Sequence, residues 1–171
     1  MESMSTARAP ERRGRTRAGA GLTLATFLPY RLNVLAAVVS EGLARSYSAR
    51  FGIGIPEWRV LATVAEFGSI TAKAIGLHAH MSKVKVSRAA ASLAERGLLH
   101  RSANEADLRE AFLALTPAGR DLFARIEPLA LAYADDLTAT LSPDDLAALD
   151  RLIEALTRRS GAARALDQAP R

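Results

Sequence analysis

The stretch that decides the fold is residues 70–120, which read ITAKAIGLHAHMSKVKVSRAAASLAERGLLHRSANEADLREAFLALTPAGR. Two segments in it have the apolar spacing of helices, from Ala72 to about His78 and from Ser82 to Arg96. A residue with N-cap chemistry stands at the start of each segment. The stretch therefore predicts two helices joined by a tight turn near His80.

The second of these helices is polar at its start and apolar on its reverse side. Val86, Ala90 and Leu93 recur at three- and four-residue spacing, so we expect them to face inward. A helix that enters the major groove of DNA presents its first turns to the base edges, where polar and cationic side chains are needed. The side chains at these positions are Ser82, Lys83, Lys85, Ser87 and Arg88. The pattern predicts that these five contact DNA.

Two short strand-like runs follow the second helix, at residues 98–102 and 109–115. The polar and acidic residues between them suit the tip of a hairpin. A helix-turn-helix with a hairpin directly behind it is the layout of a winged helix-turn-helix. The fold class expected is therefore mainly α with a small β-hairpin wing.

Longer amphipathic helices are predicted on both sides of this segment. The first runs from Pro29 to about Phe51, with Leu32, Leu35 and Tyr47 on its apolar stripe. A helix opening at Pro56 and stopping at Gly68 comes next. After the hairpin, one helix is expected from Thr116 to about Leu141 and another after the cap at Ser142, with Leu149, Ile153 and Leu156 on its stripe.

Composition and charge narrow the classes of function. The chain has 171 residues, no cysteine and a net charge of +5, which excludes disulfides, thiolate zinc sites and cysteine nucleophiles. No apolar run approaches the roughly 18 residues that span a bilayer, so a membrane protein is excluded. Residues 69–101 hold six Lys and Arg side chains against Glu95 alone. A basic block at fixed positions favours a polyanionic partner.

With the motifs set out, the run from Ile70 to Arg120 resembles the DNA-binding core of the MarR family of bacterial transcriptional regulators. MSKVKVSRAAASLAERGLL is similar to the family's recognition helix and first wing strand, and Asp107 and Arg109 followed by LTPAGR resemble its wing signature. The domain boundaries that follow are a disordered basic tail at 1–24, a MarR-type domain at 25–159 and a flexible tail at 160–171. Within the domain, the resemblance implies a winged helix-turn-helix at about 56–116 and dimerisation helices at about 28–52 and 117–159.

The resemblance implies a homodimer that binds a palindromic operator on double-stranded DNA, more often as a repressor than as an activator. It implies that Asp107 orders the wing and that Arg109 reaches the minor groove, where cationic side chains are favoured. A regulator of this kind usually responds to a small phenolic, aromatic or acyl-CoA-linked ligand. The side chains that could hold such a ligand are Tyr30, Arg31, Tyr47, Trp58 and Arg59.

Other classes of function remain as alternatives. His78, His80 and His100 allow a metal-responsive repressor, although no carboxylate cluster lies near them in the sequence. A winged helix can also serve as a protein-interaction adaptor without binding DNA. The adjacent pairs Asp135–Asp136 and Asp144–Asp145 suit helix surfaces and caps, and with no phosphate loop or serine elbow we expect neither enzymatic activity nor a cofactor.

The basic N-terminal segment lacks the apolar region of a secretory signal, so we expect a cytoplasmic protein.

Overall fold

The computed structural model describes residues 21–103 and 110–161. The chain divides into two units, a first that ends at Ala37 and a second that begins at Val38. The described part of the first unit contains the short 3-10 helix η1 (Leu24–Thr26) and the opening turns of α1 (Leu28–Phe51), and its residues are exposed. Most of both predicted tails lies outside the described residues.

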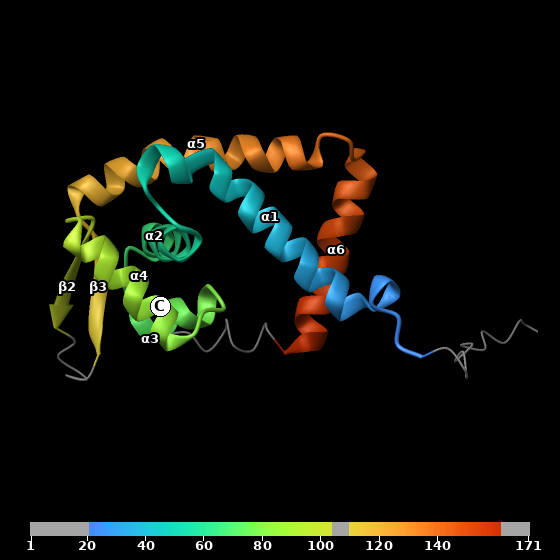
Figure 1. Ribbon diagram of the computed structural model, residues 1–171, viewed down its shortest axis with the longest axis horizontal. Helices are drawn as coiled ribbons and strands as arrows, with labels where there is room; N and C mark the ends of the chain where they lie inside the picture. Colours follow the sequence, from blue (N-terminus) through green and yellow to red (C-terminus); the bar gives the residue numbers. More distant parts are fainter. Residues whose placement is uncertain (1–20, 104–109, 162–171) are drawn as a thin grey trace, which may run out of the picture. The chain divides into compact units, whose positions relative to one another are not determined.

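The second unit holds the remaining elements. In chain order they are the end of α1, α2 (Ile55–Phe67), β1 (Ser69–Thr71), α3 (Ala72–His78), α4 (Lys83–Glu95), β2 (Leu99–Ala103), β3 (Ala111–Leu115), α5 (Pro117–Thr138) and α6 (Pro143–Ser160). Figure 1 shows α2, α3 and α4 gathered beside the strands in one lobe. The predicted fold class, mainly α with a small β wing, is confirmed.

The sheet is antiparallel and has the strand order β1–β3–β2. The predicted hairpin is confirmed, with Leu99 of β2 opposite Leu115 of β3. The third strand, β1, was not predicted, because three residues are too few to show an alternating pattern. It forms where Ile70 pairs with Leu113 and both side chains are buried. Residues 104–109, at the predicted hairpin tip, lie outside the described residues.

The core of the lobe lies between α2, α4 and the sheet. The apolar side chains that α4 was predicted to turn inward are fully buried, and they pack with the buried face of α2. The main members are Val60, Leu61, Val64, Ile75, Val86, Ala90, Leu93 and Leu113. Burial of these side chains is the dominant favourable term in holding α4 against the lobe.

The predicted N-caps are confirmed. The Oγ1 of Thr71 accepts from the Ala74 N–H at 3.2 Å, and the Oγ of Ser142 accepts from the Asp145 N–H at 3.2 Å. One boundary was wrong: α5 ends at Thr138 rather than near Leu141. There the Leu141 N–H donates to the Thr138 carbonyl at 2.9 Å, in a turn that leads into the next cap.

The turn between α3 and α4 is centred on His80, as predicted. His80 has a φ of 49°, in the left-handed region that side chains other than glycine rarely adopt. The Met81 N–H donates to the Gly76 carbonyl at 3.0 Å and closes the turn. Because Gly76 has no Cβ, the Met81 carbonyl oxygen can approach its Cα closely.

The predicted apolar stripes of the outer helices are not buried within the chain. Leu32 and Leu35 of α1 are exposed, and so are Leu149, Ile153 and Leu156 of α6. Only the end of the α1 stripe enters the core, where Tyr47 is buried. Spacing identified these helical faces, but it does not tell whether they are buried within the chain.

The junction between β3 and α5 is closed by Thr116 and Gly119. The Oγ1 of Thr116 accepts from the Gly119 N–H at 3.0 Å and donates to the Gly97 carbonyl at 2.7 Å. The Thr116 N–H donates to the Leu98 carbonyl at 3.1 Å. A Cβ on Gly119 would collide with that same Leu98 carbonyl oxygen, so only glycine fits here.

Replacing Gly119 with alanine should lower the free energy of unfolding by about 1–3 kcal/mol, because the added methyl group forces backbone atoms apart. Urea unfolding followed by circular dichroism measures the change. The control is Ala118→Ser at the exposed neighbouring position, which should unfold at the wild-type midpoint. An unchanged midpoint for Gly119→Ala would contradict the close packing of this junction.

Candidate nucleic-acid interface

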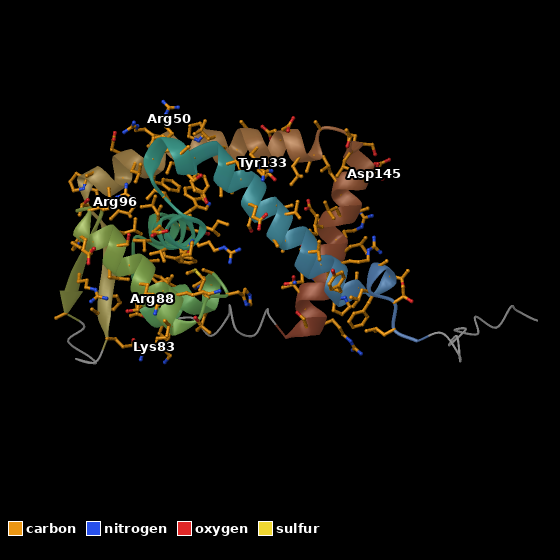
Figure 2. All side chains as sticks on the ribbon, in the orientation of Figure 1. Arg50, Lys83, Arg88, Arg96, Tyr133 and Asp145 are labelled. Atoms are coloured by element: carbon orange, nitrogen blue, oxygen red, sulfur yellow. The ribbon has the colours of Figure 1, made fainter. Side chains whose placement is uncertain are left out.

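The start of α4 presents one continuous polar and cationic face to solvent. All five predicted DNA-contact residues on this helix are exposed: Ser82, Lys83, Lys85, Ser87 and Arg88. Figure 2 shows Lys83 projecting from the start of the helix, away from the lobe. Since the reverse side of α4 is buried, the five side chains are held on the outside by the packing of the helix itself.

Ser82 has a structural role in addition to the predicted one. Its Oγ accepts from the Lys85 N–H at 3.4 Å and caps α4. The hydroxyl hydrogen remains available to donate to a phosphate oxygen. The helix N-terminus also carries partial positive charge, which favours anions at this position.

Val84 is a candidate that the sequence analysis missed. Its side chain is 58% exposed on the first turn of α4, among the polar residues. The signal was present, because Val84 lies two positions before Val86 and so cannot share its buried face. An exposed methyl group beside cationic side chains suits contact with the methyl group of thymine.

Arg96 ties the far end of α4 to α1. Its Nη1 donates to the Gly52 carbonyl and its Nη2 to the Phe51 carbonyl, each at 2.8 Å. The last carbonyls of a helix lack partners within the helix, and cations are favoured at that end. One guanidinium therefore satisfies the end of α1 and fixes the direction of α4. Sequence analysis counted Arg96 only within the basic block.

The wing residues Asp107 and Arg109 lie outside the described residues. Their predicted roles, ordering the wing and reaching the minor groove, stay predictions.

Three of the five predicted effector residues meet in the second unit. The rings of Tyr47 and Trp58 have centroids 5.5 Å apart, and Trp58 stacks on Phe123 at 5.9 Å. Arg59, next in the chain, donates from Nη2 to the Ser40 Oγ at 3.1 Å. Tyr47 and Trp58 are therefore in contact, and the prediction that they and Arg59 hold a ligand stays a prediction.

The Tyr47 hydroxyl is unusual. The side chain is 1% exposed, and the buried oxygen has no hydrogen-bond partner among the described residues. Burial raises the pKa of Tyr47 to about 12; the charge of Arg59 lowers it, and that of Glu57 raises it. A buried hydroxyl without a partner destabilises the fold.

The other two predicted effector residues, Tyr30 and Arg31, are exposed on α1 in the first unit.

The histidines and aspartates of the alternative predictions do not gather into a site. The centroids of the His78 and Phe67 rings are 4.3 Å apart. His80 is exposed in the turn, and His100 is exposed on β2. Within residues 21–103 and 110–161, no group of three or more His, Asp or Glu side chains could hold a metal ion. In the pair Asp144–Asp145, Asp145 completes the capping box of α6.

Comparison with known proteins finds similarity to the MarR family over part of the chain. A MarR family model matches residues 51–110, from the end of α1 to the start of β3. A solved MarR family transcriptional regulator from Silicibacter pomeroyi is 28% identical, with 80% of this chain and 91% of that chain covered and a TM-score of 0.68. The match covers the helix-turn-helix of this chain, and the chain shares the fold of solved MarR family regulators.

Two further MarR-type structures share the fold at lower identity. One is a MarR family regulator from Streptomyces coelicolor in complex with DNA, 20% identical over 81% of this chain and 89% of that chain, with a TM-score of 0.70. The other is BpsR of Bordetella bronchiseptica, whose DNA binding is regulated by 6-hydroxynicotinic acid; it is 18% identical over 81% of this chain and 98% of that chain, with a TM-score of 0.71. No curated protein sequence matches the chain.

None of the helices in the described part of the chain combines the length and hydropathy that crossing a membrane requires.

Replacing Tyr47 with phenylalanine should raise the free energy of unfolding by about 1 kcal/mol, because it removes a buried hydroxyl without a partner. The gain should grow as the pH rises from 10 to 12. In that range the unfolded tyrosine ionises while the folded one, with its pKa of about 12, stays protonated, so rising pH favours unfolding of the wild type.

Urea unfolding at pH 7 and pH 11 measures both effects. Tyr30→Phe at an exposed position is the control and should leave the stability at pH 7 unchanged. A destabilised Tyr47→Phe variant at pH 7 would show that the hydroxyl has a partner after all.

Proposed function

We propose that the protein is a dimeric, sequence-specific DNA-binding repressor that a small aromatic acid releases from a palindromic operator. The observation that carries the proposal is the exposed face of α4, with Lys83, Lys85 and Arg88 on the side opposite its buried residues. A helix of this kind fits the major groove with its first turns toward the bases. The family and the solved DNA complex of a related fold support this reading.

The dimer follows from the uncovered apolar faces. Leu35 of α1 is 58% exposed, and Leu152 and Ile153 of α6 are 63% and 53% exposed. Apolar faces that a chain leaves exposed are typical of a contact with another chain. In a two-fold dimer the same faces pack against their equivalents in a second copy, so each copy presents one α4 to one half-site. The operator is then a palindrome with half-sites about one helical turn apart, roughly 34–36 Å.

The wing completes the contact with DNA. In this proposal Arg109 reaches the minor groove beside the half-site and Asp107 orders the hairpin that carries it. Arg101, exposed on β2, leads toward that hairpin tip and adds positive charge. Since minor-groove contacts read the width of the groove, the wing would favour narrow A·T-rich flanks.

The effector site is proposed at Tyr47, Trp58 and Arg59. An aromatic ring would lie against the indole, the guanidinium would pair with a carboxylate, and the buried Tyr47 hydroxyl would gain a hydrogen-bond partner. The predicted ligand contacts of Tyr30 and Arg31, which lie in the first unit, stay predictions. Binding of the acid would shift the population away from the DNA-competent arrangement of the dimer. The related fold regulated by 6-hydroxynicotinic acid, an aromatic carboxylic acid, supports this choice of ligand class.

The first experiment is a mobility shift of the purified protein with the intergenic DNA beside its own coding region, over a salt series and with unrelated duplex as competitor. We expect a specific complex that weakens steeply with salt. If unrelated duplex competed as well as the intergenic DNA, the repressor proposal would fail and the protein-interaction adaptor would be favoured.

Arg88→Ala should weaken operator binding by about 1–3 kcal/mol while the dimer stays intact, because the lost guanidinium contacts a base edge or phosphate in the groove. The matched control is Arg158→Ala, which removes an exposed positive charge near the end of α6 and should bind as the wild type does. Mobility shift measures the affinities, and size-exclusion chromatography the oligomeric state. Normal operator binding by Arg88→Ala would refute the role given to α4.

Arg59→Gln should leave operator binding unchanged and abolish release by an aromatic acid, because the amide cannot pair with the carboxylate. 6-Hydroxynicotinic acid and 4-hydroxyphenylacetic acid are suitable probes, added to the preformed complex in the mobility shift. Lys73→Gln removes an exposed charge elsewhere in the lobe and should leave release intact. If Arg59→Gln and wild type were released alike, the effector would bind elsewhere.

A further inference from the structure

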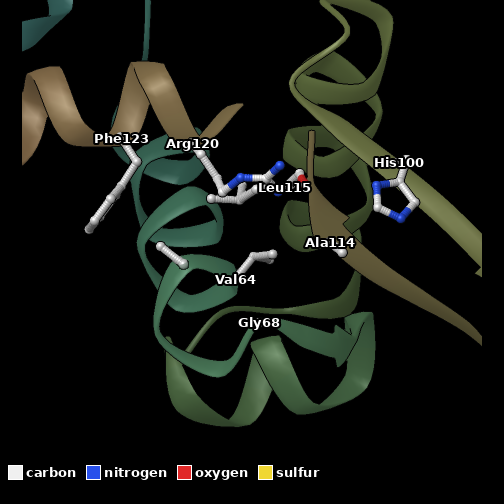
Figure 3. Close-up of a pocket in the computed structure, with 8 residues that line it drawn as sticks. Val64, Gly68, His100, Ala114, Leu115, Arg120 and Phe123 are labelled. Atoms are coloured by element: carbon white, nitrogen blue, oxygen red, sulfur yellow. Dashed lines mark hydrogen bonds between the residues drawn. The ribbon is translucent and has the colours of Figure 1, made fainter. Parts of the chain in front are cut away.

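A hollow lies in the lobe, where the end of α2 and the first turns of α5 meet the sheet (Figure 3). Its volume is about 390 Å³, within the range of small-molecule sites. Most of its wall is apolar. Val64 and Ala65 come from α2, Ala114 and Leu115 from β3, and Phe123 from α5.

The polar part of the wall is cationic or neutral. Arg120 extends from α5 toward β3, and His100 lies on β2 beside Ala114, its partner across the strands (Figure 3). The Nη1 of Arg120 donates to the Leu115 carbonyl at 2.8 Å, which holds the guanidinium at the hollow. A guanidinium has five N–H donors, so this bond leaves several for another acceptor. None of the described residues that line the hollow is acidic.

This hollow is separate from the proposed effector site. None of Tyr47, Trp58 and Arg59 lines it. The two places share one wall, because Phe123 lines the hollow and stacks on Trp58 with an angle of 10° between the ring planes. A ligand in the hollow would therefore press on the same aromatic stack from a different side of the lobe.

We infer that the hollow binds a small monocarboxylate with an apolar, preferably aromatic, body. The carboxylate would accept charge-assisted hydrogen bonds from Arg120, which already points at the site with one donor anchored. The body would lie against Phe123, Val64 and Ala114. His100 would stand at the edge of the hollow as a donor from either ring nitrogen.

The test is a titration of the full-length protein with benzoate, followed by the backbone amide NMR signals of Gly68, His100 and Ala114. Benzamide, which has nearly the same shape but no charge, is the control ligand. We expect saturable shifts at these amides with benzoate and much weaker ones with benzamide. Equal responses to the two ligands, or no saturable shift at these amides, would overturn the proposal.

Two variants test which guanidinium binds the carboxylate of benzoate. Arg120→Gln should raise the dissociation constant read at these amides about tenfold, the loss expected for one charged hydrogen bond. Arg59→Gln, which removes the guanidinium of the effector site, is the matched control and should leave it unchanged. The opposite result, a loss with Arg59→Gln and none with Arg120→Gln, would assign the shifts to the effector site and overturn the inference.

Ala114→Leu provides a second variant that leaves every charge in place. Ala114 is half-buried on the central strand, and the larger side chain should fill part of the hollow and weaken benzoate binding; urea unfolding checks that the variant is folded. Undiminished binding by this variant would overturn the inference as well. These readouts use no DNA, so they are independent of the proposed repressor function.

Discussion

The lobe depends on how α4 is held at two points. Val86, Ala90 and Leu93 are buried along its length, and Arg96 at its end donates to the last carbonyls of α1. Turning the helix would expose the apolar side chains, and moving it would break both hydrogen bonds of Arg96, one of which is half-buried. The polar face at the start of α4 thus points outward because the opposite face of the helix is buried and its end is held by Arg96. The exposure of its polar and cationic side chains is a consequence of this packing.

The motif that carried the resemblance has a structural explanation of its own. In the segment LTPAGR, Thr116 bonds to both sides of the junction between the wing and α5, and Gly119 leaves room for the Leu98 carbonyl. The motif therefore sets the angle at which α5 leaves the sheet. It thereby positions the hairpin relative to α5. The residues of this motif are therefore needed for the packing of the junction between β3 and α5.

Sequence patterns predicted the structure correctly where the interaction involves residues close together in the chain. N-caps at Thr71, Ser82 and Ser142 act within one helical turn, so residue type alone predicted them. The short strand β1 was missed because its partner, β3, is more than 40 residues away in the chain. The role of Arg96 was missed because its acceptor on Phe51 is 45 residues away in the chain. The role of Arg120 was missed because its acceptor is a backbone carbonyl, a group that every residue has. Tyr47 was placed among core or ligand residues, and its unsatisfied hydroxyl could be known only from its surroundings.

Periodicity and capping residues were enough to specify the helices, the turn at His80 and the inward and outward faces of α4, because each depends on spacing along a few turns of one helix. Tertiary structure decided what those faces meet. It joined Ile70 to Leu113, brought Tyr47 and Trp58 together, and enclosed a hollow between α2, α5 and the sheet. These features arise from contacts between segments far apart in the chain. Their geometry is set by the packing of whole elements, which no short stretch of residues encodes.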